Sequence, residues 1–394
     1  MMYLKKIWNV KEAKEELKKI GIHRDALAIL SPKMFHFNIK IENVKPQDAI
    51  IMKQEMLCCG GDAAIAYNAL PPKSEKGDVI IMGNKKQIEL LIQRLKRQYK
   101  RLKKIGEEIE NLMERVEKKV VMKIGKKLFN FGKRTYIMGI LNVTPDSFYD
   151  GGKYFSLEDA IEHAKKMERE GADIIDIGGE SSRPFSKRID EKEEMNRVLP
   201  VIEALKDEIK IPISIDTYKP NVASKAIEHG AAMINDIMAL RNGMEDVARE
   251  YDVPVVLMHM KGTPETMQIS PYYEDVMAEI IKFFGERIKF ALKNGIDEEK
   301  IIIDPGIGFG KRQEDNLQIL QHLEELKSLG MPILIGTSRK SFIGNILQLS
   351  PEERLEGSIA SAVIAMLNGA NIIRCHDVLA TKRAAMIADA IMHD

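Results

Sequence analysis

Residues 136–148 read YIMGILNVTPDSF, an apolar run of strand length that passes into a polar segment. The pattern of a short apolar run returns along the rest of the chain, over Asp173–Gly178, Pro212–Asp216, Met233–Ile237, Pro254–Met260, Ile301–Pro305, Pro332–Thr337 and Ile372–Val378. Continuously apolar strands are typical of a parallel sheet that is buried on both faces. Helical spacing separates the runs, for example over Leu157–Glu170, Tyr272–Lys293 and Arg354–Leu367, and Thr381–Met392 closes the series.

Eight such strand–helix units in about 260 residues predict a (β/α)8 TIM barrel over residues 123–394. A doubly wound sheet has the same periodicity, so periodicity alone leaves that alternative open. The placement of the polar residues argues against it.

Every predicted strand ends in polar or ionisable residues. In chain order these are Asn142, Gly179–Pro184, Asp216, Asn235 with Asp236, His259, Asp304, Ser338–Lys340, and Arg374 with His376. In a barrel the carboxyl ends of the strands share one rim, which carries function. A single Asp or His at a strand end has ordinary structural explanations, but buried charges are uncommon unless paired or liganded. Polar or ionisable residues at eight successive strand ends predict a functional rim.

The residue types divide this rim into two sides. One side favours anions and suits phosphate, with Arg339, Lys340, Arg374, His376 and, as a possible metal ligand, Asn142. The other is rich in acceptors and suits a flat heterocycle with several N–H groups, through Asp216, Asn235 and Asp304. Gly306, Gly308 and Gly310 allow close backbone approach. The expected ligand is a nitrogen heterocycle that carries a phosphate-type group.

Five segments of the rim together resemble the dihydropteroate synthase family. They are ILNVTPDSF with DGG (140–152), DIGGESSRP (176–184), DPGIGFGK (304–311), SRKSF (338–342) and RCHDV (374–378). The resemblance covers Arg134–Asp394, about two-thirds of the chain. It implies a transferase that condenses 6-hydroxymethyl-7,8-dihydropterin diphosphate with p-aminobenzoate and releases diphosphate.

The resemblance also implies roles for individual residues. The pterin ring would be held by Asp216, Asn235, Asp304 and Lys340, and the diphosphate by Asn142, Arg374 and His376, with Mg²⁺ between Asn142 and the phosphate oxygens. The amine pocket would be lined by Phe148, Ser182, Pro184, Phe309 and Ser341. Asp150, Arg183 and Lys340 would act in catalysis.

The chemistry that the resemblance implies needs mainly electrostatics and positioning. The bond to break joins a pterin methylene to diphosphate, and Mg²⁺ with Arg374 and His376 would stabilise the leaving group. Asp150 would stabilise the cation that forms on the pterin. An arylamine is already neutral at pH 7, so its attack requires no strong general base.

Three departures from the family pattern leave the amine open. Phe185 follows Arg183-Pro184 where the family has Gly, Ser182 replaces a frequent Thr, and Lys261 replaces a common Gln. A methanogen-type archaeal relative would use a ribosylated aminobenzene phosphate, whose phosphate Lys187, Arg188 or Lys261 could hold. A charged fraction of 30%, typical of thermophile proteins, fits that alternative. Two other classes of function stay open as alternatives, a pterin-dependent methyltransferase and a non-catalytic pterin-binding paralogue.

Residues 1–122 are predicted to form a small α/β domain of unknown function. The expected elements are a helix over Val10–Ile20, strands over Phe35–Ile41, Asp48–Met52 and Val79–Met82, and a turn at Gly60–Gly61 into a helix capped by Asp62. Apolar residues at steps of three and four over Lys85–Val121 predict one long amphipathic helix that ends the domain.

Composition narrows the class of protein. Lys and Arg number 60 against 59 Asp and Glu, so the net charge of +1 gives no reason to expect a nucleic-acid partner. No signal peptide or membrane span is recognisable, and Cys58, Cys59 and Cys375 form no CxxC pair, so a cytoplasmic protein with reduced thiols is expected. The resemblance suggests a homodimer through the last helices of the barrel.

Overall fold

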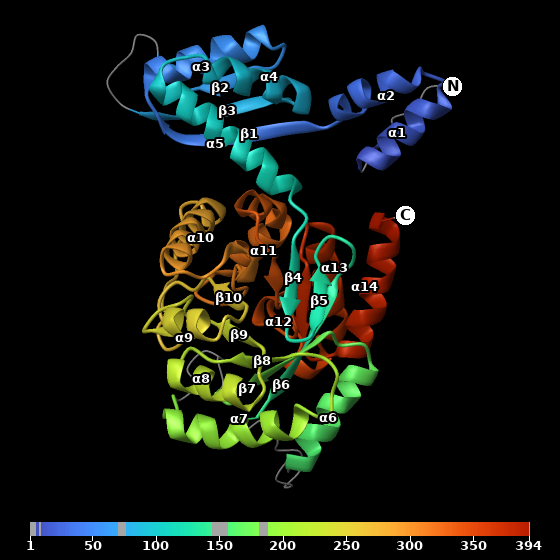
Figure 1. Cartoon of the computed structure of the whole chain (residues 1–394), viewed down its shortest axis with the longest axis vertical. Helices are drawn as coiled ribbons and strands as arrows, with labels where there is room; N and C mark the ends of the chain where they lie inside the picture. Colours follow the sequence, from blue (N-terminus) through green and yellow to red (C-terminus); the bar gives the residue numbers. More distant parts are fainter. Residues whose placement is uncertain (1–4, 8, 70–75, 144–156, 181–187, 394) are drawn as a thin grey trace. The chain divides into compact units, whose positions relative to one another are not determined.

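The computed structural model describes residues 5–7, 9–69, 76–143, 157–180 and 188–393 (Figure 1). The chain divides into two compact units, Met1–Glu117 and Lys118–Asp394. None of the helices in the described part is long and apolar enough to cross a membrane.

The second unit is built on an eight-stranded parallel sheet. Its strands are β6 (Tyr136–Asn142), β7 (Ile174–Gly178), β8 (Ile213–Asp216), β9 (Met233–Asp236), β10 (Val255–Met258), β11 (Ile301–Asp304), β12 (Leu334–Ile335) and β13 (Ile372–Cys375). They lie in the order β11-β10-β9-β8-β7-β6-β13-β12, and a parallel bridge between Ile303 and Ile333 joins the two ends. The predicted TIM barrel is confirmed.

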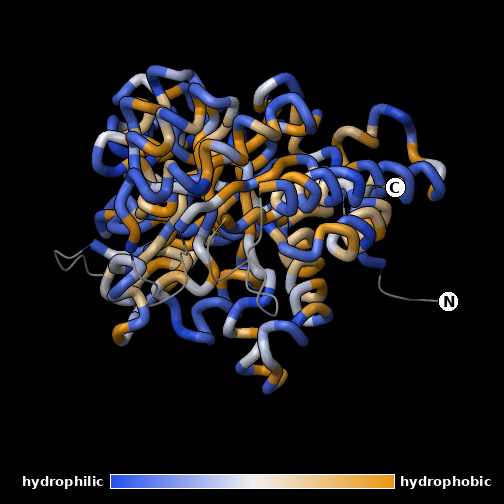
Figure 2. Tube along the Cα trace, turned by 90° about the horizontal axis from the view of Figure 1, so that it is seen from below, coloured by the Kyte–Doolittle hydropathy of each residue, from blue (hydrophilic) through white to orange (hydrophobic). Residues whose placement is uncertain are grey.

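Each strand of this barrel is followed along the chain by one or two helices. They are α6 (Leu157–Arg169), α7 (Glu191–Leu205), α8 (Pro220–His229), α9 (Met244–Glu250), α10 (Val276–Lys293), α11 (Gln313–Gln321), α12 (Ser341–Leu347), α13 (Leu355–Leu367) and α14 (Val378–His393), with short 3-10 turns at Glu298–Lys300, Leu323–Leu329 and Pro351–Glu353. Apolar stretches run through the interior of this unit, whereas hydrophilic stretches dominate its outside (Figure 2). The four residues of β9, β10 and β11 are buried without exception, as expected of strands covered on both faces.

A β-hairpin belongs to the amino-terminal end of the barrel. It consists of β4 (Val121–Ile124) and β5 (Lys127–Asn130), paired antiparallel. The rings of Phe129 and Tyr136 lie 4.8 Å apart and those of Phe131 and Tyr136 5.4 Å apart. These side chains form one buried cluster with Met138, Ile174, Met233, Val256, Ile302, Leu334 and Ile372, which come from seven of the eight barrel strands. The cluster fills this end of the barrel with apolar side chains.

The first unit is a three-stranded antiparallel sheet with helices. Its elements are α1 (Val10–Lys19), α2 (Arg24–Leu30), a 3-10 turn (Ser31–Met34), β1 (His36–Val44), α3 (Pro46–Cys58), β2 (Asp62–Ile65), a 3-10 turn (Tyr67–Ala69), β3 (Gly77–Asn84), α4 (Lys85–Lys96) and α5 (Lys100–Glu117), and the strand order is β1-β3-β2. The helix predicted over Val10–Ile20 and the strands predicted over Phe35–Ile41 and Val79–Met82 are confirmed.

Two short predictions in this unit are wrong. Asp48–Met52 lies in helix α3, where Pro46 occupies the first turn and Ala49, Met52 and Met56 are buried at helical spacing. Gly60–Gly61 leads into strand β2 and not into a helix, so Asp62 begins a strand. A short apolar run does not distinguish a strand from a buried helix segment by itself.

The single long helix predicted over Lys85–Val121 is also wrong, because the chain turns between α4 and α5. The buried carboxylate of Asp48 accepts hydrogen bonds from the Tyr99 hydroxyl and from Arg101, which fixes this turn. The two helices then pack closely, since a Cβ on Gly106 would lie 3.1 Å from Cβ of Leu95. Residues 121–124, predicted to straddle the domain boundary, form β4 of the second unit.

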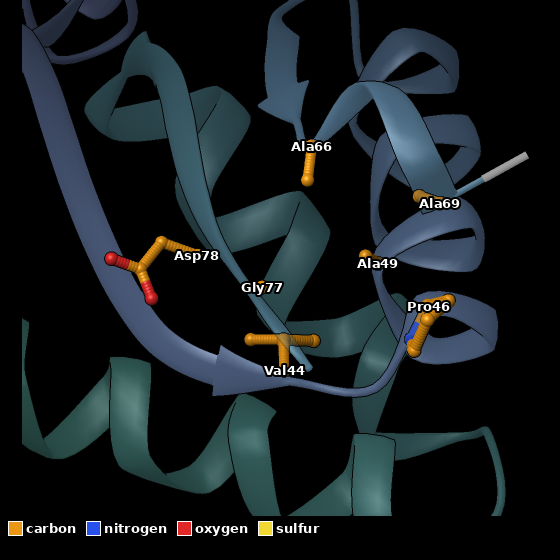
Figure 3. A pocket seen from close by; sticks show the side chains of 7 residues that line it. All are labelled: Val44, Pro46, Ala49, Ala66, Ala69, Gly77 and Asp78. Atoms are coloured by element: carbon orange, nitrogen blue, oxygen red, sulfur yellow. The ribbon is translucent and has the colours of Figure 1, made fainter. Parts of the chain in front are cut away.

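A small cavity lies in the first unit between α3, β3 and the residues that follow β2 (Figure 3). It is lined by Val44, Pro46, Ala49, Ala66, Ala69, Gly77 and Asp78. Its volume is about 10 Å³, which leaves space for one water molecule at most. It is therefore a packing feature and not a ligand site.

Candidate active site

Four side chains from four strands meet inside the carboxyl end of the barrel. Arg374 on β13 donates from Nε to Oδ2 of Asp176 on β7 and from Nη2 to Oδ2 of Asp216 on β8, both at 2.6 Å. Asn235 on β9 donates from Nδ2 to Oδ2 of Asp176 at 2.9 Å. The sequence placed Asp216, Asn235 and Arg374 on this rim, and the structure brings them into one connected cluster.

Asp176 is the member of the cluster to which the sequence assigned no role. It is fully buried, and within the described part of the chain its Oδ1 has no hydrogen-bond partner. A charged residue inside the apolar strand Ile174–Gly178 is a signal that could have identified it, because a buried carboxylate requires a partner. Asp176 engages both Arg374 and Asn235, so it orients two of the predicted ligand-binding side chains.

The electrostatics of the cluster follow from its burial. Burial raises the pKa of Asp216, which the guanidinium of Arg374 opposes. Burial also works against the charge of Arg374, yet Asp176 and Asp216 hold the pKa of Arg374 above its usual value. The cluster therefore keeps one permanent positive charge between two carboxyl groups in a site withdrawn from water. Hydrogen bonds and charges act strongly in such surroundings.

Asp304 lies at the end of β11 and is held by the glycine segment that follows it. The backbone N–H of Gly306 donates to Oδ1 of Asp304 at 2.7 Å. Burial raises the pKa of Asp304, and the Gly306 hydrogen bond and the charge of Lys340 oppose that rise. Asp304 thus presents a buried acceptor on the side of the mouth opposite β7 in the strand order.

The glycines of this segment are required by the chain's own packing. Gly306 and Gly310 have φ values of 69° and 61°, which favour glycine. A Cβ at Gly306 would lie 2.1 Å from the carbonyl oxygen of His259, and one at Gly310 would lie 2.3 Å from that of Lys261. The close approach expected at these two glycines is therefore to the end of β10, and no ligand is needed to explain it.

Lys340 and Phe309, both predicted to line the site, lie together. Nζ of Lys340 is 4.2 Å from the centre of the Phe309 ring, an attractive arrangement for a cation over an aromatic face. A Cβ at Gly308 would lie 3.5 Å from Cδ of Lys340, so Gly308 leaves room for the lysine chain. Ser341 is the first residue of α12, directly after Lys340.

The residues predicted to hold an anion differ in how they are engaged. His376 lies 2.9 Å from the Ser338 hydroxyl through Nδ1, and burial together with Arg374 lowers the pKa of His376 to about 3. Its imidazole is therefore neutral. Arg339 forms a two-bond ion pair with Asp377, at 2.7 and 3.0 Å, and so is already committed to a carboxylate. Asn142 ends β6 beside Gly178.

Five of the predicted site residues lie outside the described residues. They are Phe148, Asp150, Ser182, Arg183 and Pro184, and Lys187, offered for the phosphate of a ribosylated amine, lies outside the described residues as well. Their assignments stay predictions from the resemblance.

A buried lysine lies beneath the glycine segment. Nζ of Lys311 lies 3.0 Å from Nδ1 of His259 and donates to the carbonyl oxygens of His259 (3.2 Å) and Phe309 (3.0 Å). Burial lowers the pKa of Lys311 to about 7. Burial and the Lys311 charge also lower the pKa of His259 to about 2, so His259 is a neutral structural partner.

Replacing Lys311 by Met should change how the free energy of unfolding depends on pH. The unfolded chain keeps a proton on this lysine up to about pH 10.5 and the folded chain only up to about pH 7. Wild-type stability relative to Lys311→Met therefore rises with pH between these two values, by up to about 5 kcal/mol. Urea unfolding of both proteins between about pH 6 and pH 10 measures this. A stability difference that is constant with pH would mean that Lys311 stays charged in the fold.

Comparison with known proteins points to one family. The model of the family "Pterin binding enzyme" matches residues 138–376. The dihydropteroate synthase of Clostridium beijerinckii is 50% identical over 274 residues, which are 69% of this chain and 99% of the relative. That of Bacillus subtilis is 48% identical over 266 residues, 67% of this chain and 91% of the relative.

Solved structures agree with the sequence relatives. Yersinia pestis dihydropteroate synthase, in a sulfonamide drug complex, is 45% identical with a TM-score of 0.66, covering 69% of this chain and 98% of that chain. The Xanthomonas albilineans dihydropteroate synthase with 4-aminobenzoic acid is 44% identical with a TM-score of 0.66, covering 70% of this chain and 100% of that chain. Each match covers about the length of the barrel unit.

Proposed function

Since this chain belongs to the pterin-binding enzyme family, among its dihydropteroate synthases, we propose how its rim carries out their reaction. The enzyme condenses a dihydropterin diphosphate with p-aminobenzoate and releases diphosphate. The observation that carries the assignment of residues is the buried cluster of Asp176, Asp216, Asn235 and Arg374. Of the classes that the sequence left open, high identity to synthases supports this one over a methyltransferase or a non-catalytic paralogue.

The pterin ring lies against Asp216, Asn235 and Asp304 in this proposal. A carboxylate that faces a ring N–H and an adjacent amino group accepts two parallel hydrogen bonds, which fixes the orientation of the ring. Asp304 is buried and the Asp216 side chain is only 13% exposed, so water competes little for these bonds. Lys340, whose ammonium lies over the Phe309 ring, would contact the pterin ring and also line the adjoining amine pocket.

The diphosphate lies toward Asn142, Arg374 and His376. Among the described residues, no group of three or more His, Cys, Asp or Glu side chains is placed to hold a metal ion. Mg²⁺ usually keeps several waters and binds through one or two protein oxygens plus substrate phosphates, so a single amide oxygen of Asn142 fits it. When bound, Mg²⁺ would neutralise charge on the leaving diphosphate. The neutral imidazole of His376 would donate a hydrogen bond, and Arg374 would supply the fixed positive charge.

We assign p-aminobenzoate, and not a phosphorylated ribosyl derivative, to the amine side. Two of the cations offered for an extra phosphate are already paired: Lys261 with Glu279 at 3.0 Å and Arg188 with Glu265 at 3.0 Å. Lys261 also donates to the Tyr272 carbonyl oxygen. Phe309, Lys340 and Ser341 then line the pocket for a flat amine. Phe148, Ser182 and Pro184 complete it by resemblance, with Asp150 and Arg183 acting on the reacting groups.

A substrate comparison tests this assignment. The purified enzyme with Mg²⁺ and the dihydropterin diphosphate should release diphosphate with p-aminobenzoate, with kcat/KM at least about tenfold above that for the ribosyl phosphate derivative, or about 1.4 kcal/mol. Chelation of the metal should remove the activity, and re-addition of Mg²⁺ should restore it. Ring binding without turnover for any arylamine would overturn the function. A preference for the ribosyl phosphate would overturn only the amine.

We also propose that two copies associate through α13 and α14. These neighbouring helices leave large apolar side chains in water, namely Ile364 and Leu367 on α13 and Leu379, Met386, Ile387 and Ile391 on α14. Ile391 is 75% exposed and Ile387 65%. An apolar surface of this kind on a soluble protein marks an interface.

Ile387→Asp should therefore shift the enzyme toward the monomer. A charge placed in an apolar interface costs several kcal/mol, so the dissociation constant should rise by about a hundredfold or more. Light scattering after size exclusion over a range of concentrations measures it. Leu292→Asp on α10, where the leucine is 43% exposed, is the matched control and should leave the assembly unchanged. If both variants keep the wild-type mass at all concentrations, the interface lies elsewhere.

A further inference from the structure

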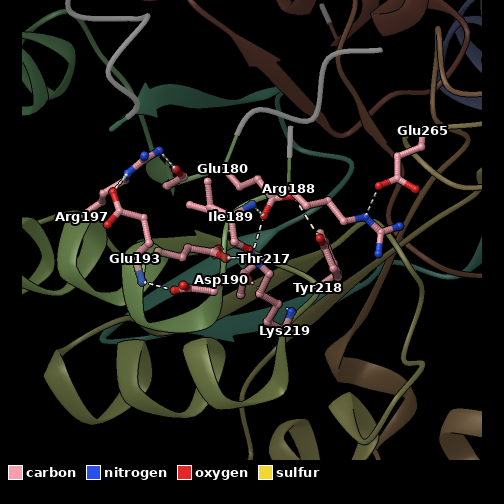
Figure 4. A network of polar contacts seen from close by, with 12 residues as sticks. Glu180, Arg188, Ile189, Asp190, Glu193, Arg197, Thr217, Tyr218, Lys219 and Glu265 are labelled. Atoms are coloured by element: carbon pink, nitrogen blue, oxygen red, sulfur yellow. Dashed lines mark hydrogen bonds and ion pairs between the residues drawn. The ribbon is translucent and has the colours of Figure 1, made fainter. Parts of the chain in front are cut away.

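Lys219 is a buried lysine of the rim that none of the proposed roles uses. It follows β8 and precedes α8, and its side chain is 11% exposed. Its ammonium donates to Oε2 of Glu180 at 2.5 Å, to Oε2 of Glu194 at 2.7 Å and to the carbonyl oxygen of Ile189 at 2.7 Å (Figure 4). An ammonium has three donors, and all three are used.

The acceptors come from both sides of the connection between β7 and α7. Glu180 is the last described residue before 181–187, and Ile189 follows that segment by two residues. Glu194 lies in the first turn of α7 and is 1% exposed. A single nitrogen atom therefore joins the chain before residues 181–187 to the chain after them. It also ties both to the end of β8, three residues after Asp216.

Neighbouring contacts support the same arrangement. The Tyr218 hydroxyl donates to Oε1 of Glu180 at 2.9 Å, and the backbone N–H of Ile189 donates to Oε2 of Glu180 at 3.4 Å. The Arg188 guanidinium lies 6.0 Å from the centre of the Tyr218 ring. Asp190 then caps α7 by accepting the N–H of Glu193 at 2.7 Å. Figure 4 shows these side chains converging between the β7–α7 connection and the β8–α8 connection.

Such a network is a poor means of stabilising a fold. Two carboxylates share one lysine away from water, and burial raises the pKa of Glu194 against the opposing charge of Lys219. Apolar side chains of similar volume are often as stabilising as a buried ion group, whereas a defined geometry needs the directed bonds. The network also lies on the functional rim and not at the apolar end of the barrel. Both points favour a role in geometry.

We propose that Lys219 is a positioning residue for the arylamine substrate, because its ammonium fixes the residues on both sides of 181–187 relative to β8. The proposal rests on the function proposed above, which assigns amine contacts to residues of that connection. Lys219 itself touches neither substrate. Its loss should therefore affect the amine and leave the binding of the pterin diphosphate nearly unchanged, since Asp216, Asn235 and Asp304 keep their partners.

The test separates position from stability through three variants. Lys219→Met should raise KM for p-aminobenzoate at least tenfold, but it also leaves Glu180 and Glu194 facing each other without a cation. Lys219→Met combined with Glu194→Gln removes that repulsion and should recover most of the melting temperature. Its KM for p-aminobenzoate should stay raised, because Glu180 and Ile189 still lack their shared donor. Lys219→Arg keeps the charge but spreads its donors over a rigid fork, so KM should rise by an intermediate factor.

Two controls accompany these variants: the affinity for the pterin diphosphate, and a variant of a cation outside the network. The dissociation constant of the dihydropterin diphosphate, measured by calorimetry without amine, should change less than threefold in all three variants. Arg134→Met removes a partly buried cation that pairs with Asp173 before β7, and it should leave both substrate constants unchanged. A wild-type KM for p-aminobenzoate in Lys219→Arg or in the double variant would overturn the proposal. So would a pterin constant that rises in parallel with that KM. Failure of wild-type turnover would instead overturn the function itself.

Discussion

Asp216→Asn will lower kcat/KM for the condensation by about a thousandfold, or about 4 kcal/mol. In the proposed site the carboxylate offers acceptors to the ring and is a partner of Arg374, whereas an amide turns an N–H₂ group toward one of these donors. A site built to pair a polar substrate group loses heavily when one of its own groups is mismatched in a buried setting. Steady-state rates at varied pterin diphosphate, with saturating p-aminobenzoate, measure the loss.

The loss should appear in ring binding as well as in turnover. Calorimetric titration of Asp216→Asn with the pterin diphosphate should give a dissociation constant at least a hundredfold above the wild type. Asp246→Asn on α9 is the control, because that carboxylate is exposed and its ion pair in the described part of the chain is with neighbouring Arg249. It should keep wild-type kinetics. If Asp216→Asn stays within tenfold of the wild type in kcat/KM, the ring does not lie on Asp216.

Arg374→Met will both destabilise the barrel and abolish turnover. The methionine leaves Asp176 and Asp216 buried side by side without a cation, and breaking a buried pair in this way costs about 3–5 kcal/mol. The melting temperature of the barrel should fall by roughly 10 °C. In the proposed site the diphosphate also loses its fixed positive charge, so kcat should fall at least a thousandfold. Calorimetric melting and diphosphate release measure the two effects.

A second substitution distinguishes the two consequences. Adding Asp176→Asn to Arg374→Met removes one of the two unpaired charges, so part of the stability should return while activity stays lost. Arg249→Met serves as a surface control, since its ion pair with Asp246 is exposed and worth less than about 1 kcal/mol. An Arg374→Met protein that melts as the wild type does would mean that the carboxyl groups are protonated in the fold.

The barrel could be predicted from sequence because its signals are local. Each strand is a short apolar run that ends in a polar residue, and parallel strands bring their ends to one edge whatever their sequence. The convergence of Asp216, Asn235 and Arg374 follows from that geometry. Asp304, Lys340 and Phe309 follow from it in the same way. The run Pro332–Thr337 contains only Leu334–Ile335 as strand, so the extent of β12 was not predictable from apolarity.

What could not be predicted depends on partners that are distant in sequence. The pattern over Lys85–Val121 stays in helical phase across the turn, and only Asp48, some fifty residues earlier, reveals why the chain turns there. Likewise, nothing local says that Arg374 and Arg339 are engaged by carboxylates, or that Lys219 and Lys311 are buried. A side chain's partner is a property of the packed fold, whereas its strand is a property of the neighbouring residues.

The β4–β5 hairpin determines at which residue the chain can be shortened to remove the first unit. A shortened protein that begins at residue 123 would keep β5 but lose half of β4, and Phe129 and Phe131 would then cover the barrel with no paired strand beside them. One that begins at Lys118 keeps the hairpin whole. The boundary between the two units lies at Glu117–Lys118, and a cut further along the chain would damage the barrel at the end opposite its chemistry, since Val120 already belongs to the apolar cluster there.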